Sequence, residues 1–351
     1  MLDFWRGIAI SLVLIDHLAY FRYGTAVRLW IAGLRASDAR IPRIAGTLGS
    51  PAFEALPQIG IVGVMIFFIV SGYIITKLLL DEERISGAVS IPRFYARRAA
   101  KTLPPYLVYV AFVSFALMRG WVANPPAPQT PCLAFLANTN LTDCRWHFYH
   151  LWSISIEEQF YLVWPLLFLF VPPVRRSIAI GGASIIFLGL ASFNIFTFST
   201  WISNGRSFAA ILVGILYALS PRFRRAALTV FPHAAAIVLA TLAFARFPLP
   251  PHLNMAYFPS MILVLLGIIV TSYRFRPFVP APLFAAVAGI GIVSYSGYIW
   301  QQIFMEIDGA YPRPSLLMHP IFFIPIVLAS YFLIERPMAA WSRARFSVRR
   351  R

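Results

Sequence analysis

The feature that most constrains the fold is a series of apolar runs, each about as long as a membrane-spanning helix. The core of a bilayer is about 30 Å thick, and a helix needs ~20 apolar residues to cross it. Such runs recur along the 351 residues, at 5–23, 58–80, 103–119, 151–172, 177–195, 206–220, 227–245, 256–272, 289–306 and 318–336. They predict an all-α, polytopic membrane protein of about ten transmembrane helices, with residues 1–351 forming a single transmembrane domain.

The charge content supports this class. Only 12% of the residues are charged, whereas a soluble domain has about 25%, so most side chains are expected to face lipid or one another. The net charge is +17, but the basic residues are spread over short loops and no basic domain is present. This distribution argues against a nucleic-acid partner. We expect the basic residues to set the topology and to contact anionic lipid headgroups.

An even number of spans puts both termini on one side of the membrane. If that side is the cytoplasm, about two-thirds of the 30 basic residues lie inside, in agreement with the positive-inside rule. The C-terminal segment SRARFSVRRR supports this orientation, and the arginines between residues 22 and 43 oppose it. We therefore expect both termini to be cytoplasmic.

The first apolar run contains ionisable residues. Such residues cost several kcal/mol in hydrocarbon, so they usually face the interior of the bundle and mark a functional site. Arg6 and His17 are 11 residues apart, which places them on one helical face and ~16 Å apart along the axis. Asp16 points about 100° away. The alternative for His17 is a structural role, in which hydrogen bonds between helices satisfy the imidazole.

A second polar cluster lies in HFYHLWSISIEEQFYLVWP, residues 147–165. In a helix, His150, Ser153, Glu157 and Tyr161 form one stripe, because they recur at intervals of three or four residues. A carboxylate inside a span has to be neutral or paired. The stripe could bind sugar hydroxyls or orient a histidine, and the alternative is that it joins neighbouring helices.

Two further segments carry candidate site residues. In IPRFYARRAAKTLPPYL, residues 91–107, Arg98 and Lys101 are one helical turn apart and follow Arg97. They can bind one phosphate between them, although a cluster of this kind can also be a plain topological anchor. The segment GIVSYSGYIWQQIF, residues 291–304, contains Ser294 and Tyr298 and is rich in polar and aromatic residues. It is expected to line a polar cavity or to lie at the membrane interface.

Both cysteines, Cys132 and Cys144, fall in one loop that this topology places outside the cytoplasm. An oxidising compartment permits a disulfide, and we predict that the two are bridged. Two unrelated thiols are the alternative. No CxxC or HxxxH spacing occurs, so no metal site is expected.

Six segments then carry a resemblance to a known family. LDFWRGIAISLVLIDH, VGVMIFFIVSGYIITKLL, FYARRAAKTLPPYL, HLWSISIEEQFYLVWP, SYSGYIWQQ and IERPM resemble, in this order, the membrane acyltransferase 3 family. That family contains bacterial sugar O-acetylases acting on lipopolysaccharide, exopolysaccharide and peptidoglycan. The resemblance implies a ten-helix acyltransferase core in the bacterial inner (cell) membrane, with an acyl-CoA donor on the cytoplasmic side.

The resemblance also implies roles for individual residues. His17 matches the catalytic histidine of the first helix, and Glu157 matches the glutamate of the fourth-span motif. The cations Arg6, Arg97, Arg98 and Lys101 are expected to hold the phosphates of acetyl-CoA, and the hydroxyl-bearing residues Ser153, Tyr161, Ser294 and Tyr298 are expected to bind substrate. Two positions depart from the family pattern: Lys101 stands where the arginine pair would end, and Gln301 stands where many members have a histidine.

The predicted function is O-acyl transfer, from cytoplasmic acetyl-CoA or another acyl-CoA to a hydroxyl of a cell-surface or lipid-linked saccharide. The expected partners are the acyl-CoA, a saccharide or glycolipid acceptor and membrane lipids. An imidazole titrates near neutrality and can take the hydroxyl proton as the oxygen attacks the thioester. The alternatives are a polysaccharide or lipid transporter or flippase, which buried charges and a broken ninth helix would suit, and a scaffold subunit. The sequence leaves open the acceptor, the acyl length, the oligomeric state and whether an acyl-enzyme forms.

Overall fold

The computed structural model describes residues 1–17, 59–121, 133–139, 146–192, 199–229, 233, 261–272, 276–304 and 320–346. Within these ranges the structure is helical and contains no strand, which confirms the all-α prediction. Cys132 and Cys144 lie outside the described residues, so the disulfide stays a prediction. The labelled α-helices are α1 (Leu2–His17), α5 (Ile59–Ser86), α6 (Ile91–Met118), α8 (Trp146–Tyr149), α9 (Leu151–Phe170), α10 (Pro173–Ser192), α11 (Ser199–Leu219), α12 (Pro221–Thr229), α15 (Ala281–Ile292), α16 (Ser294–Phe304), α17 (Phe323–Ser330) and α18 (Arg336–Phe346). Met261–Ser272 is also helical.

Most of the predicted apolar runs coincide with helices, because a backbone in lipid has to satisfy its hydrogen bonds internally. At two places the observed helix boundaries differ from those of the predicted apolar runs. Helix α6 begins at Ile91, with Pro92 in its first turn, so the cationic segment before residue 103 is part of the helix. The ninth run forms two helices, α15 and α16, which meet at an angle of 71°.

Three continuous helices in the described part are long and apolar enough to cross a membrane: Gly60–Ser86, Ile91–Met118 and Phe323–Phe346. The last of these comprises α17, a π-helical turn at Tyr331–Glu335, and α18. Two bent pairs raise the number to five if each is one span, namely α11 with α12, bent by 108°, and α15 with α16. The described residues thus contain three to five candidate spans, and the total of ten stays a prediction.

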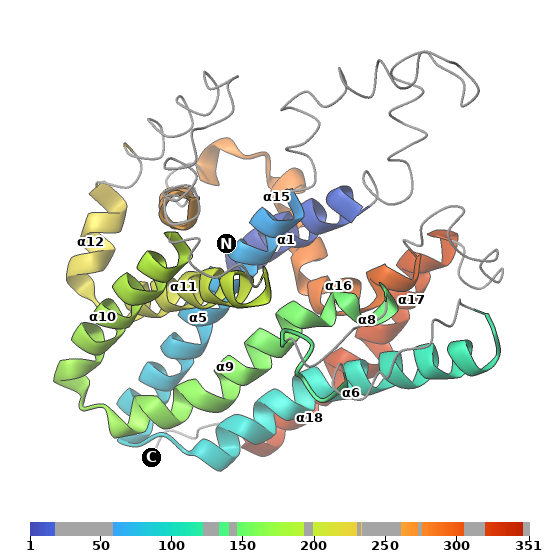
Figure 1. Cartoon of the computed structure of the whole chain (residues 1–351), viewed down its shortest axis with the longest axis horizontal. Helices are drawn as coiled ribbons and strands as arrows, with labels where there is room; N and C mark the ends of the chain where they lie inside the picture. Colours follow the sequence, from blue (N-terminus) through green and yellow to red (C-terminus); the bar gives the residue numbers. More distant parts are fainter. Residues whose placement is uncertain are drawn as a thin grey trace.

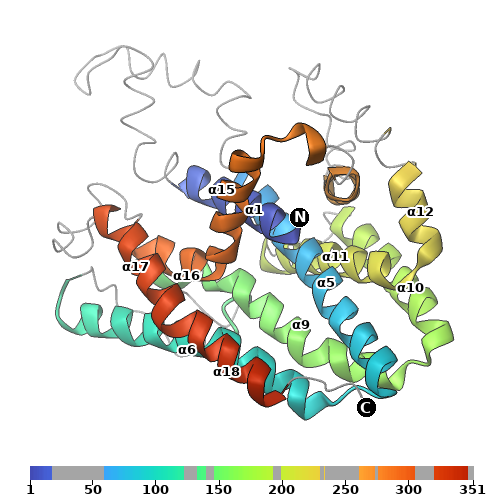
Figure 2. The same ribbon diagram turned by 180° about the vertical axis from the view of Figure 1, so that it is seen from behind.

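The helices form two groups on either side of α5 and α9 (Figure 1). On one side, α11 packs on α5 and also contacts α10 and α12. On the other side, α6 packs on α18 and α16. Seen from behind, α17 and α18 form one long rod (Figure 2), of which α18 packs on α6. Helix α1 crosses near the centre and contacts α5, α15 and α16, so its side chains lie between the two groups.

Glycines fix the position of α1. A Cβ atom on Gly291 of α15 would lie 1.7 Å from the Asp3 carbonyl oxygen, and one on Gly63 of α5 would lie 2.5 Å from the Ala9 oxygen. Small residues let helix backbones approach closely in this way, as is common within membranes. Helix α1 is therefore held on two sides, and both its register and its rotation are set by close backbone contacts.

Candidate functional site

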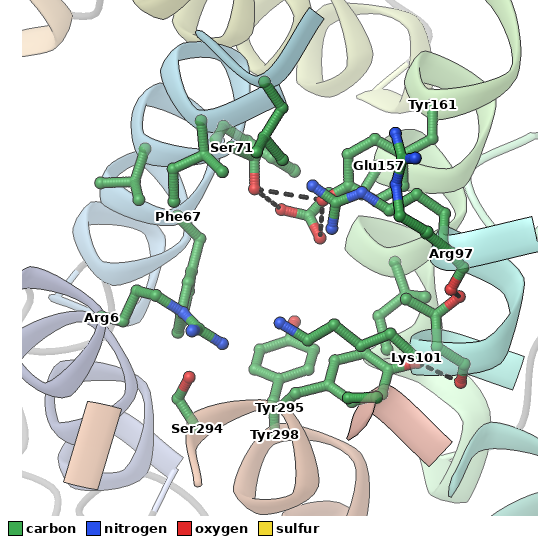
Figure 3. A pocket seen from close by; sticks show the side chains of 18 of the residues that line it. Arg6, Phe67, Ser71, Arg97, Lys101, Glu157, Tyr161, Ser294, Tyr295 and Tyr298 are labelled. Carbon is green, nitrogen blue, oxygen red and sulfur yellow. Dashed lines mark hydrogen bonds between the residues drawn. The ribbon is translucent and has the colours of Figure 1, made fainter. Parts of the chain in front are cut away.

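A cavity of about 330 Å³ lies between α1, α5, α6, α9, α16 and α18, within the size range of small-molecule sites. Its lining brings together residues that are far apart in the sequence (Figure 3). Nine of the ten predicted site residues are among them: Arg6, Arg97, Arg98, Lys101, Ser153, Glu157, Tyr161, Ser294 and Tyr298. His17 is not a lining residue.

The charge of the lining is strongly positive. Glu157 is the one carboxylate among the described lining residues, whereas five cations take part: Arg6, Arg97, Arg98, Lys101 and Arg343. The cavity also has apolar and aromatic walls, including Phe67 and Phe94. Such a lining favours a ligand that has both an anionic part and an apolar or uncharged part.

Arg97 is held by groups outside the lining. Its guanidinium donates to the Oε2 atom of Glu82 at 2.6 Å and to the carbonyl oxygen of Phe346 at 2.9 Å. Glu82 is buried and also accepts the backbone N–H of Ser90 at 3.0 Å. Arg97 therefore joins the end of α5 to the end of α18, and this structural role competes with the predicted contact to a phosphate.

Arg98 and Lys101 have no such partner. In the described part of the chain, neither side chain has a carboxylate within ion-pair distance. The Arg98 guanidinium lies 4.6 Å from the centre of the Tyr161 ring, a cation–π contact. Lys101 and Arg6 point toward the middle of the cavity from opposite walls (Figure 3). Arg6 also forms an ion pair with Asp3 at 3.4 Å, so Arg98 and Lys101 are the two of these three cations that have no carboxylate partner among the described residues and are placed to meet an anionic ligand.

The carboxylate of Glu157 is oriented by two hydroxyls. Ser71 of α5 donates to its Oε1 atom at 2.6 Å, and Tyr161 donates to its Oε2 atom at 3.3 Å. The hydrogen bonds described for Glu157 go to α5 and to its own helix, so the hypothesis that the stripe containing Glu157 orients a histidine stays a prediction. Glu157 presents an oriented carboxyl group to the cationic cavity.

The hydroxyl-bearing residues differ in whether their hydroxyl groups are already hydrogen-bonded. Ser153 of α9 and Tyr298 of α16 are hydrogen-bonded to each other at 2.6 Å, which ties the two helices together. Ser294 is buried, and its Oγ atom has no partner in the part of the chain that the structure describes. A buried polar atom without a partner is uncommon, so the Ser294 hydroxyl is available to a ligand in the cavity.

His17 lies beside the part of α16 that follows Tyr298. Its Nδ1 atom is 3.1 Å from the Oε1 atom of Gln301, one helical turn after Tyr298 on α16. Arg6 and His17 are both on the side of α1 that approaches α16, as their spacing predicted, but ~16 Å of helix separates them. The two therefore have different surroundings: Arg6 lines the cavity, whereas His17 contacts Gln301 and is not a lining residue.

A second histidine contacts the same helix, α16. The Nε2 atom of His150 is 3.0 Å from the carbonyl oxygen of Ile299. Because a carbonyl only accepts, Nε2 carries a proton and Nδ1 carries the lone pair in the neutral ring. That Nδ1 atom is buried and has no partner among the described residues. His150 was predicted to share the stripe of Glu157; it is the residue directly before α9 and is not a lining residue of the cavity.

Three residues of this region were not predicted as site residues. Ser71 lies on α5, Arg343 lies on α18, and Gln301 was noted only as a departure from a family pattern. Ser71 gave no signal in a span that is otherwise ordinary, and Arg343 is one of several arginines near the C-terminal end. In the described residues, no group of three or more His, Cys, Asp or Glu is arranged to hold a metal ion.

Comparisons with known proteins extend over most of the chain. The model of the acyltransferase 3 family, described as an acyltransferase domain, matches residues 1–335. No solved structure matches.

Two of the curated relatives illustrate the similarity. A Staphylococcus aureus (strain COL) protein named "Putative O-acetyltransferase SACOL0978" is 26% identical over 317 residues, which cover 79% of this chain and 52% of that protein. A Komagataeibacter xylinus protein named "Putative membrane-bound transacylase BcsY" is 26% identical over 310 residues, which cover 79% of this chain and 76% of that protein. The chain thus spans about half the length of the staphylococcal relatives that it matches.

Proposed function

Because the chain belongs to the acyltransferase 3 family, we propose that it transfers an acetyl or other acyl group from cytoplasmic acyl-CoA to a hydroxyl of a saccharide. Membership of the family makes it a membrane acyltransferase; the donor, the acceptor and the location in the bacterial inner membrane are the proposal. The acceptor is a cell-surface polysaccharide or a lipid-linked sugar. With both termini in the cytoplasm, the side of the cavity that α18 lines with Arg343 would face the donor.

The observation that carries this proposal is the cationic cavity. Coenzyme A has several phosphate charges at one end and an uncharged pantetheine arm that ends in the thioester. Arg6, Arg98 and Lys101 supply positive charge without an equal number of acidic partners, and phosphates bind strongly to such groups. The aromatic walls suit the arm, because ligand sites are mostly apolar with a few placed polar groups.

The reaction would take place at the far end of the arm, near His17. The imidazole takes the proton of the acceptor hydroxyl while that oxygen attacks the thioester carbonyl carbon. The carbon–sulfur bond then breaks, and the thiolate of coenzyme A takes up the proton from the imidazolium. General-base catalysis of this kind contributes about 10²–10⁴-fold to a rate.

Transfer of label from the donor tests this function. Membranes containing the protein are incubated with acetyl-CoA labelled in the acetyl group, together with glycan fractions from the same envelope. We expect the label to appear in an alkali-labile ester on a saccharide, and mass spectrometry identifies the sugar. A transporter or flippase would move a lipid-linked sugar without transferring label, so unlabelled glycan combined with protein-dependent transport would contradict the proposal.

A further inference from the structure

We propose that Gln301 is a positioning residue for the reaction, which holds the imidazole of His17 with its proton on Nδ1 and its lone pair on Nε2. This inference rests on the proposed function, since it assigns a role in acyl transfer to a residue that lies outside the cavity. Gln301 acts through His17 and is not itself a catalytic residue.

The geometry begins with the contact between the two side chains. Oε1 of Gln301 is 3.1 Å from Nδ1 of His17, and Gln301 is fully buried. An amide oxygen accepts and cannot donate, so Nδ1 of His17 has to be the donor. In the neutral ring the other nitrogen, Nε2, then carries the lone pair. Gln301 therefore selects which ring nitrogen can act as a base.

The backbones keep this contact in place. Helix α1 packs so closely on α15 that a Cβ atom on Gly7 would lie 2.0 Å from the Val287 carbonyl oxygen. Helix α16 follows α15 after a single residue, Val293. Its next turns are joined to α9 through Tyr298 and Ser153. Helix α1, which contains His17, and helix α16, which contains Gln301, are thus fixed relative to each other. A general base needs such a fixed orientation.

A hydrogen-bonding partner of this kind has a large effect on a histidine. Residues that orient a metal-binding histidine through its second nitrogen commonly change activity or metal affinity about 10–100-fold when removed, and the same orienting contact is present here. We expect Gln301→Leu to lower kcat by about that factor, while the KM for acetyl-CoA and for the acceptor stays within about twofold, because the cavity does not include Gln301.

The neighbouring residue provides a matched control. Gln302 is also buried in α16, and its Oε1 atom has no partner in the described residues. Gln302→Leu therefore makes the same chemical change in the same helix without removing the contact to His17, and kcat should be unchanged. Equal kcat values for the two variants would overturn the proposal, as would a loss in Gln301→Leu that is explained by lower amounts of folded protein.

Two measurements separate this inference from the proposed function. In a double mutant, His17→Ala with Gln301→Leu should be no slower than His17→Ala alone, because the effect of Gln301 passes through the imidazole. Additive losses in the double mutant would contradict a role of Gln301 that passes through the imidazole.

Nitrogen-15 NMR of histidine-labelled protein in membranes needs no activity. The His17 signal should report a protonated Nδ1 in the native protein and in Gln302→Leu, and a mixture of tautomers in Gln301→Leu. A protonated Nε2 in the native protein would overturn the inference even if acyl transfer is confirmed.

Discussion

Replacing His17 with alanine should lower the rate of acyl transfer at least about 100-fold, since general acid–base catalysis contributes about 10²–10⁴-fold. His17 contacts Gln301 and is not a lining residue of the cavity, so its removal should leave the binding of acetyl-CoA by the cavity intact. We therefore expect kcat to fall while the dissociation constant of acetyl-CoA stays within about twofold. Steady-state transfer assays and equilibrium binding on the same purified samples measure the two quantities.

A substitution nearby on the same helix controls for folding. Ile15 is 51% exposed and faces away from the contact with Gln301, so Ile15→Ala should retain the native rate. The amount of each variant in the membrane is compared by quantitative blotting. If His17→Ala transfers label at the native rate, the imidazole has no part in the chemistry, although the chain still belongs to the acyltransferase 3 family.

Reversing the charges of Arg98 and Lys101 should have the second large effect. A hydrogen bond to a charged group contributes about 1.5–3 kcal/mol, and each 1.4 kcal/mol is tenfold in affinity. Arg98→Glu and Lys101→Glu should therefore each weaken acetyl-CoA binding by at least about tenfold, and the pair by at least about 100-fold. Isothermal calorimetry or filter binding in nanodiscs provides the dissociation constants.

A second ligand that lacks the phosphates makes this test specific for the phosphate site. S-acetylpantetheine carries the same thioester without the phosphates, so its affinity should not depend on Arg98 or Lys101. Arg175→Glu, at an exposed position of α10, makes the same change of net charge away from the cavity and should leave both affinities unchanged. If the variants at Arg98 and Lys101 bound acetyl-CoA normally, or lost affinity for both ligands equally, the assignment of the phosphate site would be wrong.

Local periodicity predicted much of the candidate site. Ser153, Glu157 and Tyr161 face one cavity because residues three and four apart share a helix face. The same reasoning placed Arg6 and His17 on one side of α1. It could not show that ~16 Å of helix leaves His17 outside the cavity lining, since the extent of a cavity depends on the elements around it.

Contacts between distant segments could not be predicted in this way. Arg97 and Arg98 are adjacent in the sequence, but they point about 100° apart on α6, so one pairs with Glu82 and the other lies over Tyr161. Which of them is available depends on how α5 and α18 pack. Gln301 likewise gained a role only when α16 was placed beside α1. The helices themselves were predictable because apolar length is a local property, whereas the bend between α15 and α16 was predicted only as a broken ninth helix.

A structure with the donor bound tests the central claim most directly. The measurement is a cryo-electron microscopy map of the protein in a nanodisc with a non-hydrolysable analogue of acetyl-CoA. The account predicts density for the phosphates between Arg98 and Lys101, with the pantetheine arm running past Tyr298 so that the acetyl group ends beside His17. Density for the donor outside this cavity, or an arm that leads away from His17, would contradict it.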